Sequence, residues 1–258
     1  MAHFRDPTGF ECVGGTSTTR TERPLFSVSI PDQFPPPMRI ALLTSLLVMT
    51  GCVKNAVSGA QHMESLHIVQ AGNPVLRNRA QDVPVEKINT PEFQKLITTM
   101  IDTMREAPGV GLAAPQLGVP WRVLVLEDRA ELLSGLTQLE RDERERVPVA
   151  VRVFINPTLT PVGEEKVGFF EGCLSVAGFA GYVERFREVE VSGLDEHGLQ
   201  QTWRVKGWPA RILQHEVDHL DGTLYIDRMN TRSFGTMSQV KDRFGGKPIT
   251  QVRHELGL

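Results

Sequence analysis

Apolar and polar residues follow a helical period near the middle of the chain. Between residues 90 and 105, apolar side chains recur every three or four positions. Thr90 suits an N-cap and Pro91 suits a first turn, so a helix is expected to begin there. The helical spacing places the apolar residues on one face, which we assign to the core. These are Phe93, Leu96, Ile97, Met100, Ile101 and Met104.

Other stretches have the composition of strands. Residues 121–127 (WRVLVLE) and 149–156 (VAVRVFIN) are rich in branched apolar side chains. Residues 189–205 contain two strand-like runs around Asp-Glu-His-Gly, which predicts a hairpin with His197 in its turn. A central helix follows at 209–222, beginning near Pro209 and ending at Gly222. Strands grouped before this helix predict an α+β fold, with antiparallel or mixed sheets around it.

Two segments differ from the rest of the chain. Residues 129–148 are strongly charged, and we interpret them as a solvated, partly helical insertion without a chemical role. Residues 1–62 form an N-terminal extension whose start is rich in Thr, Pro, Gly and Arg, which is typical of disorder. Its run 38–52 resembles a signal peptide. Three interpretations stay open: a lipoprotein signal with lipid on Cys52 if translation starts at Met38, an organelle-targeting extension, or a misassigned start codon.

Composition narrows the class of protein. The 258 residues predict one domain, at 63–258, after the extension, with a poorly defined tail after about residue 234. A net charge of −3 gives no reason to expect a nucleic-acid site. We find no apolar run of about eighteen residues, so no membrane span is predicted. Three unevenly spaced cysteines make no disulfide framework, which favours a reducing compartment.

The predicted central helix carries candidate chemistry. It contains H-E-x-x-H, with His215 and His219 four residues apart and therefore on one helical face. Two such imidazoles can chelate a metal, and Glu216 lies beside them as a proton carrier. A catalytic metal of the zinc type usually takes three protein ligands and one water, so the motif lacks a ligand.

The usual zinc-protease completions of this motif are missing. The position that would hold a third histidine is occupied by Tyr225, and Glu255 is the only glutamate after Glu216. Cys173, in FFEGCLSVAG, is the alternative candidate because a thiolate binds iron or zinc well. Taken alone, Cys173 would be read as a small buried apolar residue.

Three motifs in order carry a family resemblance: GVGLAAPQLG at 109–118, EGCLS at 171–175 and QHEVDHLDG at 214–222. Together they resemble peptide deformylases over about residues 64–230, closest to the mitochondrial or plant-type branch. The resemblance implies metal-dependent hydrolysis of the N-formyl group from formylmethionine at the start of new polypeptides, with release of formate. It also implies one divalent metal ion, Fe²⁺ first, with Zn²⁺, Ni²⁺ or Co²⁺ as substitutes.

The resemblance further implies a role for each matching residue. Cys173, His215 and His219 hold the metal, and Glu216 is the general base. The side-chain amide of Gln116 and the backbone N–H of Leu174 face the oxyanion. Gly111 contacts the formylmethionine backbone, and Val110 walls the pocket for its side chain.

Expectations also cover the residues around the site, the partners, the cellular location and the rival functions. Glu171 is preferred to Asp218 as the hydrogen-bond partner of a ligand histidine, and Trp208 is expected in the core. The implied partners are nascent formylated chains near the ribosome exit, in the bacterial cytosol. The alternative addresses are an organelle, reached through the extension, or a lipid anchor at Cys52. A metal-stabilised binding protein and another metallohydrolase remain rival functions.

Overall fold

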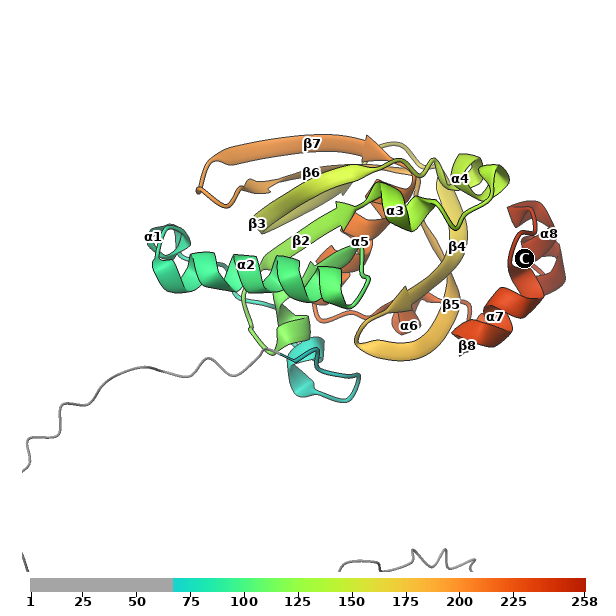
Figure 1. The fold of residues 1–258 in the computed structure, drawn as a ribbon, viewed down its shortest axis with the longest axis horizontal. Coiled ribbons are helices and arrows are strands. Elements are labelled where there is room, and N and C mark those ends of the chain that lie inside the picture. The colour runs from blue at the N-terminus through green and yellow to red at the C-terminus, as the bar shows by residue number, and fades with distance from the viewer. Residues whose placement is uncertain (1–66) are drawn as a thin grey trace, which may run out of the picture. The chain divides into compact units, whose positions relative to one another are not determined.

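The structure is a computed structural model, and residues 67–258 are described here (Figure 1). The predicted extension 1–62, with Cys12, Cys52 and the run 38–52, lies outside the described residues. The helices are α1 Val85–Ile88, α2 Pro91–Glu106, α3 Ala130–Leu133, α4 Gln138–Arg144, α5 Trp208–Leu220, α6 Tyr225–Arg228, α7 Met237–Phe244 and α8 Ile249–Leu256. The strands are β1 Gly111–Ala113, β2 Val123–Asp128, β3 Val149–Pro161, β4 Lys166–Cys173, β5 Val176–Phe186, β6 Glu188–Leu194, β7 Gln200–Lys206 and β8 Gly235–Thr236.

A five-stranded antiparallel sheet, in the order β1-β2-β3-β6-β7, has a helix on each face. Side chains alternate between the faces of a strand, so the run Val-Leu-Val-Leu in β2 serves both. Val123 and Val125 join the core formed with α2, while Leu124 and Leu126 join the core formed with α5. Burial on both faces explains why this strand is apolar throughout.

The second sheet is antiparallel and has the order β4-β5-β8. Phe170 packs edge-on against Tyr182 and stacks on Phe244 of α7, which covers the outer face of the β4–β5 hairpin. Glu171 and Cys173 reach instead toward α5, as their hydrogen bonds to its side chains show. The central helix α5 therefore lies between the two sheets (Figure 1).

The boundaries of α2 and α5 follow the sequence signals. The Thr90 hydroxyl accepts a hydrogen bond from the Phe93 N–H, as expected for an N-cap. Helix α5 has Pro209 in its first turn and ends just before Gly222, whose φ is +74°. A side chain at Gly222 would also meet the Arg77 carbonyl at 2.7 Å, so glycine is required there.

The charged insertion and the tail meet in the structure. Residues 129–148 contain α3 and α4, as the partly helical prediction stated. No element was predicted after residue 234, yet β8, α7 and α8 occupy that region. The backbone N–H of Ile249 donates to both carboxylate oxygens of Glu143, at 3.0 and 3.1 Å. The tail is thus fixed to the insertion, a partnership that no local pattern indicates.

Helices and antiparallel sheets together confirm the α+β prediction, and both sheets are antiparallel. The hairpin of β6 and β7 is present, with His197 in its turn. Asp195 stabilises that turn by accepting from the backbone N–H groups of His197 and Leu199. Within residues 67–258, no helix combines the length and apolar character needed to cross a membrane.

Candidate metal centre and active site

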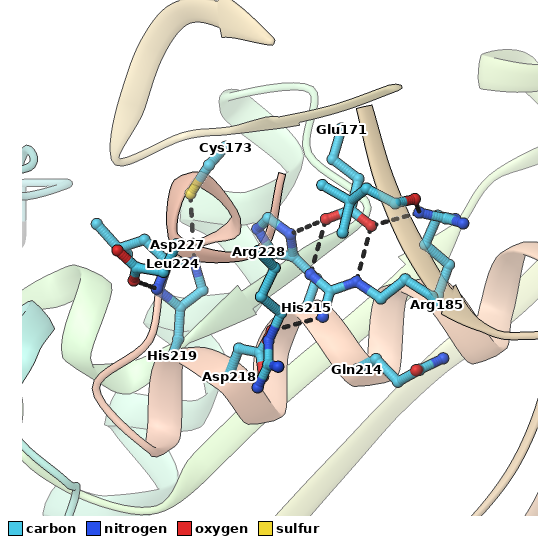
Figure 2. Close-up of polar contacts among 12 residues, drawn as sticks. Glu171, Cys173, Arg185, Gln214, His215, Asp218, His219, Leu224, Asp227 and Arg228 are labelled. Atoms are coloured by element: carbon cyan, nitrogen blue, oxygen red, sulfur yellow. Dashed lines mark hydrogen bonds and ion pairs between the residues drawn. The ribbon is translucent and has the colours of Figure 1, made fainter. Parts of the chain in front are cut away.

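Cys173, His215 and His219 form one cluster between β4 and α5. Their potential ligand atoms all lie within 4.8 Å of one another. The Cys173 Sγ is 3.2 Å from the His219 Nε2, a contact drawn in Figure 2. The two histidines project from one face of α5, and the register of the β4–β5 pair shifts between Gly172 and Cys173. This bulge lies where the thiol turns toward the helix.

Glu171 orients one of the histidines. Its Oε2 lies 3.0 Å from the His215 Nδ1, which leaves the Nε2 of that ring for another partner. Arg185 binds both carboxylate oxygens at 2.8 and 2.9 Å (Figure 2), and Arg211 donates to Oε1 at 2.6 Å. Burial alone would raise the pKa of Glu171, but Arg185 and His215 outweigh burial and hold that pKa well below its ordinary value. The preference for Glu171 as the histidine's partner is confirmed.

Asp218 belongs to a neighbouring ion pair. It accepts two hydrogen bonds from Arg228, at 2.7 and 2.8 Å, and one from Arg185. It therefore supports the cluster through Arg185 and contacts neither imidazole directly. The fully paired chain of carboxylates and guanidiniums makes this buried polar layer rigid.

The surroundings of His219 favour an uncharged imidazole. Burial, followed by positive charge at His215 and Arg185, lowers its pKa well below the ordinary value. A neutral imidazole offers a lone pair, which is the form that binds a metal. Its Nδ1 is buried and has no hydrogen-bond partner among the described residues. A thiolate with two imidazoles suits a divalent transition metal, so the residues present fit such an ion.

Glu216 is a buried carboxyl group beside the cluster. Burial raises its pKa to about 7 and outweighs the positive charges of His215 and Arg185, which lower it. The negative charges of Glu171 and Asp218 act in the same direction as burial. Within the described part of the chain, its Oε2 has no hydrogen-bond partner. The backbone of Gly111 approaches so closely that a Cβ there would lie 2.3 Å from the Oε1 of Glu216. Glu216 is therefore free to exchange a proton with a small ligand.

Gln116 is fixed beside the thiol. It lies in a short 3-10 helix at Ala114–Leu117 and is almost fully buried. Its Oε1 accepts from the Ala113 N–H at 2.8 Å, which directs the Nε2 donor toward the Cys173 Sγ at 3.6 Å. The same Nε2 lies 3.4 Å from the Ser175 hydroxyl. The amide thus presents its donor side to the cluster.

The first described segment ties the loop after Cys173 in place. The Gln70 side chain donates to the Leu174 carbonyl at 2.9 Å and accepts from the Ala177 N–H at 3.3 Å. The Ala71 N–H donates to the Ser175 carbonyl at 2.7 Å. These bonds set the direction of the peptide groups around Leu174. They join residues about a hundred positions apart, so sequence pattern gave no signal for them.

A pocket of about 550 Å³ opens onto the cluster. The predicted residues Val110, Gly111, Gln116, Leu174 and Glu216 all line it. Several further lining residues were not predicted from the sequence. These are Arg146 of the charged insertion, Phe170 of β4, and Met237 of the tail.

Trp208 also lines this pocket, although it was expected in the core. It does pack against the buried cluster of α5 and β2, so both descriptions hold. It is the first residue of α5, at the end of the helix remote from His219.

Comparisons with known proteins agree with this site. A model of the polypeptide deformylase family matches residues 65–234. The chain belongs to the polypeptide deformylase family. It is 51% identical over 173 residues to the chloroplastic peptide deformylase 1A of Solanum lycopersicum, covering 67% of this chain and 62% of that protein. It is 43% identical over 189 residues to the mitochondrial peptide deformylase of Homo sapiens, covering 73% and 78%.

Solved deformylase structures share the fold. A Met-Ala-Ser-bound class I type b peptide deformylase from Acinetobacter baumannii superposes with a TM-score of 0.57 at 33% identity, covering 64% of this chain and 98% of that one. The resemblance to the plant and mitochondrial branch is confirmed. The match spans less than two thirds of the tomato protein and also of the Arabidopsis thaliana relative, at 64%.

Proposed function

We propose that this protein removes the N-formyl group from the formylmethionine of newly synthesised polypeptides by metal-dependent hydrolysis, releasing formate. The observation that carries the proposal is the Cys173, His215 and His219 cluster with the buried carboxyl of Glu216 beside it. A divalent ion held by the three residues would supply Lewis acidity and lower the pKa of a water molecule toward roughly 7. We propose Fe²⁺ as the native ion, with Zn²⁺, Ni²⁺ and Co²⁺ as substitutes.

Glu216 moves the proton in the proposed reaction. It accepts a proton from the water that attacks the formyl carbon and then delivers it to the departing amine. A pKa of about 7 suits both transfers, because the group can be either base or acid near neutral pH. The absence of a side chain at Gly111 leaves room for the carboxylate.

Gln116 and the Leu174 N–H stabilise the negative charge that develops on the formyl oxygen. The bond from Ala113 fixes the Gln116 amide before substrate arrives. Donors fixed in advance lower the barrier more than mobile ones, and removing one typically costs about 2.7–4 kcal/mol.

The edges of two sheets can bind the peptide. β1 is a terminal strand of the five-stranded sheet and β4 is a terminal strand of the three-stranded sheet. Residues of both line the pocket, so an extended chain can add between them through backbone hydrogen bonds. Gly111 meets the formylmethionine backbone, and Val110 contacts its side chain. The Met-Ala-Ser-bound structure of a family member supports a peptide ligand here.

Formate release tests the proposal. Purified protein loaded with Fe²⁺ is given formyl-Met-Ala-Ser, and Met-Ala-Ser serves as the unformylated control. We expect formate from the first and no cleavage of the second. Glu216→Gln should retain the metal but lose most turnover, by roughly 10²-fold or more. Cleavage of only the unformylated peptide would reject the proposal and favour another metallohydrolase.

The cellular address remains part of the proposal. Deformylation takes place on nascent chains, so we propose a location near the ribosome exit, in the bacterial cytosol. The names of the chloroplastic and mitochondrial relatives favour an organelle as the alternative. Lipidation at Cys52, with translation starting at Met38, is the third prediction. N-terminal sequencing of the mature protein separates these cases.

A further inference from the structure

We propose that Arg146 closes the end of the methionine pocket remote from the metal centre and so limits the length of the side chain that the enzyme accepts. The inference rests on the proposed function. Arg146 comes from the charged insertion and lines the pocket together with Val110, Trp208 and Ile212. The guanidinium lies 5.2 Å from the centre of the Trp208 ring.

Helix α5 gives the depth of the pocket. Trp208, Ile212 and His215 all line it, so the pocket follows the helix for two turns. At 1.5 Å per residue, Trp208 lies about 10 Å along the axis from His215. The Arg146 guanidinium lies over the Trp208 ring, so along α5 it stands about two turns from His215.

Arg146 also separates the pocket from a groove on the outside. Its two neighbours in sequence, Glu145 and Val147, line this second hollow of about 820 Å³. Two consecutive residues of α5 also line different hollows: Trp208 lines the inner pocket and Pro209 lines the outer groove. The Arg146–Trp208 pair therefore forms the partition between the two hollows.

The partition is held rigidly. Arg146 donates to both carboxylate oxygens of Asp128, at 2.7 and 2.9 Å, and Asp128 is completely buried. The Arg146 side chain is only 11% exposed. A bidentate pair fixes the plane of a guanidinium, and stacking on an indole adds a second constraint. Such a side chain can act as a wall, which an exposed, mobile arginine cannot.

Substrate selectivity tests the inference. We compare kcat/KM for formyl-Met-Ala with that for formyl-2-aminodecanoyl-Ala, whose side chain is longer and unbranched. Wild type should favour methionine strongly. Arg146→Ala should raise the ratio of the long substrate to methionine by at least about tenfold, because the extra methylenes gain an apolar space. Arg146→Met, which restores length without charge, should return the ratio toward the wild-type value.

Arg144→Ala is the matched control. Arg144 stacks on the same Trp208 ring, at 5.7 Å, but does not line the pocket. It should leave the selectivity ratio unchanged. Arg146→Ala and Arg146→Met both leave the Asp128 carboxylate unpaired, so each of them combined with Asp128→Asn carries the test if the single variants do not fold.

The outcomes separate the two proposals. A wild type that releases no formate rejects the proposed function itself. If wild type is active but the folded Arg146 variants keep its selectivity ratio, the inference about Arg146 is overturned and the proposed function stands. An equal rise in Arg144→Ala also overturns it, because general loosening would then explain the change.

Discussion

A methyl group at Gly111 should disable the reaction while leaving the protein folded. The added Cβ would lie 2.3 Å from the Oε1 of Glu216, and real Cβ contacts essentially never fall below 3.0 Å. The carboxylate must therefore retreat by about 0.7 Å in a close-packed site. A general base displaced by nearly 1 Å can lose roughly 10²-fold in rate, which corresponds to about 2.7 kcal/mol of barrier. We expect Gly111→Ala to lower kcat by that factor and to retain its metal.

Single-turnover formate release and metal analysis measure these quantities. Gly172→Ala is the control, because Gly172 lines the same pocket and its added Cβ would meet nothing closer than 3.4 Å. In a Glu216→Gln background, Gly111→Ala should lower kcat little further, since both changes act on the Glu216 carboxyl group. A Gly111→Ala enzyme with wild-type kcat, or a full additional loss in the double variant, would refute the reasoning.

Three further changes probe the surroundings of the cluster. Cys173→Ala should lose metal, and a metal-to-protein ratio near one would contradict a ligand role. Glu171→Gln should lower the free energy of unfolding at pH 7 by about 3–5 kcal/mol, since buried Arg211 loses its charged partner and buried Arg185 keeps only Asp218. The pKa of the Glu171 carboxyl is held well below its ordinary value of 4.5, so its contribution to stability is present above pH 4.5 and is lost progressively as the pH falls toward the lowered pKa. The free energy of unfolding, measured with denaturant, should therefore fall less between pH 7 and pH 3 in Glu171→Gln than in wild type, and an equal fall in both would contradict this reasoning. Gln70→Ala should lower kcat several-fold with unchanged metal content, because the Leu174 loop loses two side-chain bonds; an unchanged kcat would exclude positioning by Gln70.

Local patterns predicted the elements that carry the chemistry. The period of apolar residues and the Thr90 cap located α2, and the histidine spacing placed His215 and His219 on one face of α5. These features depend on neighbours within about four residues, so the linear sequence contains them. Glu171, two residues before Cys173, was preferred as the partner of a ligand histidine, and both residues do reach α5 in the structure.

The long-range partners could not be found in this way. Arg185 and Arg211 reach Glu171 from 14 and 40 residues away, and no spacing rule connects them. The charged insertion was expected to be solvated and without a chemical role. The expected solvation is wrong for Arg146, whose side chain is mostly buried and lines the pocket because its carboxylate partner, Asp128, ends a buried strand. Charged residues are usually exposed, and Arg146 is buried because it pairs with Asp128.

By itself, the sequence determined the α+β class, the H-E-x-x-H motif on a helix and Cys173 as a candidate ligand, because each follows from local period, caps or residue chemistry. Tertiary structure alone decided which distant groups surround them. It set the raised pKa of Glu216, the ion pairs around Glu171 and the residues that line the pocket. These properties arise from burial and from contacts across the chain, and neither exists until the two sheets enclose α5.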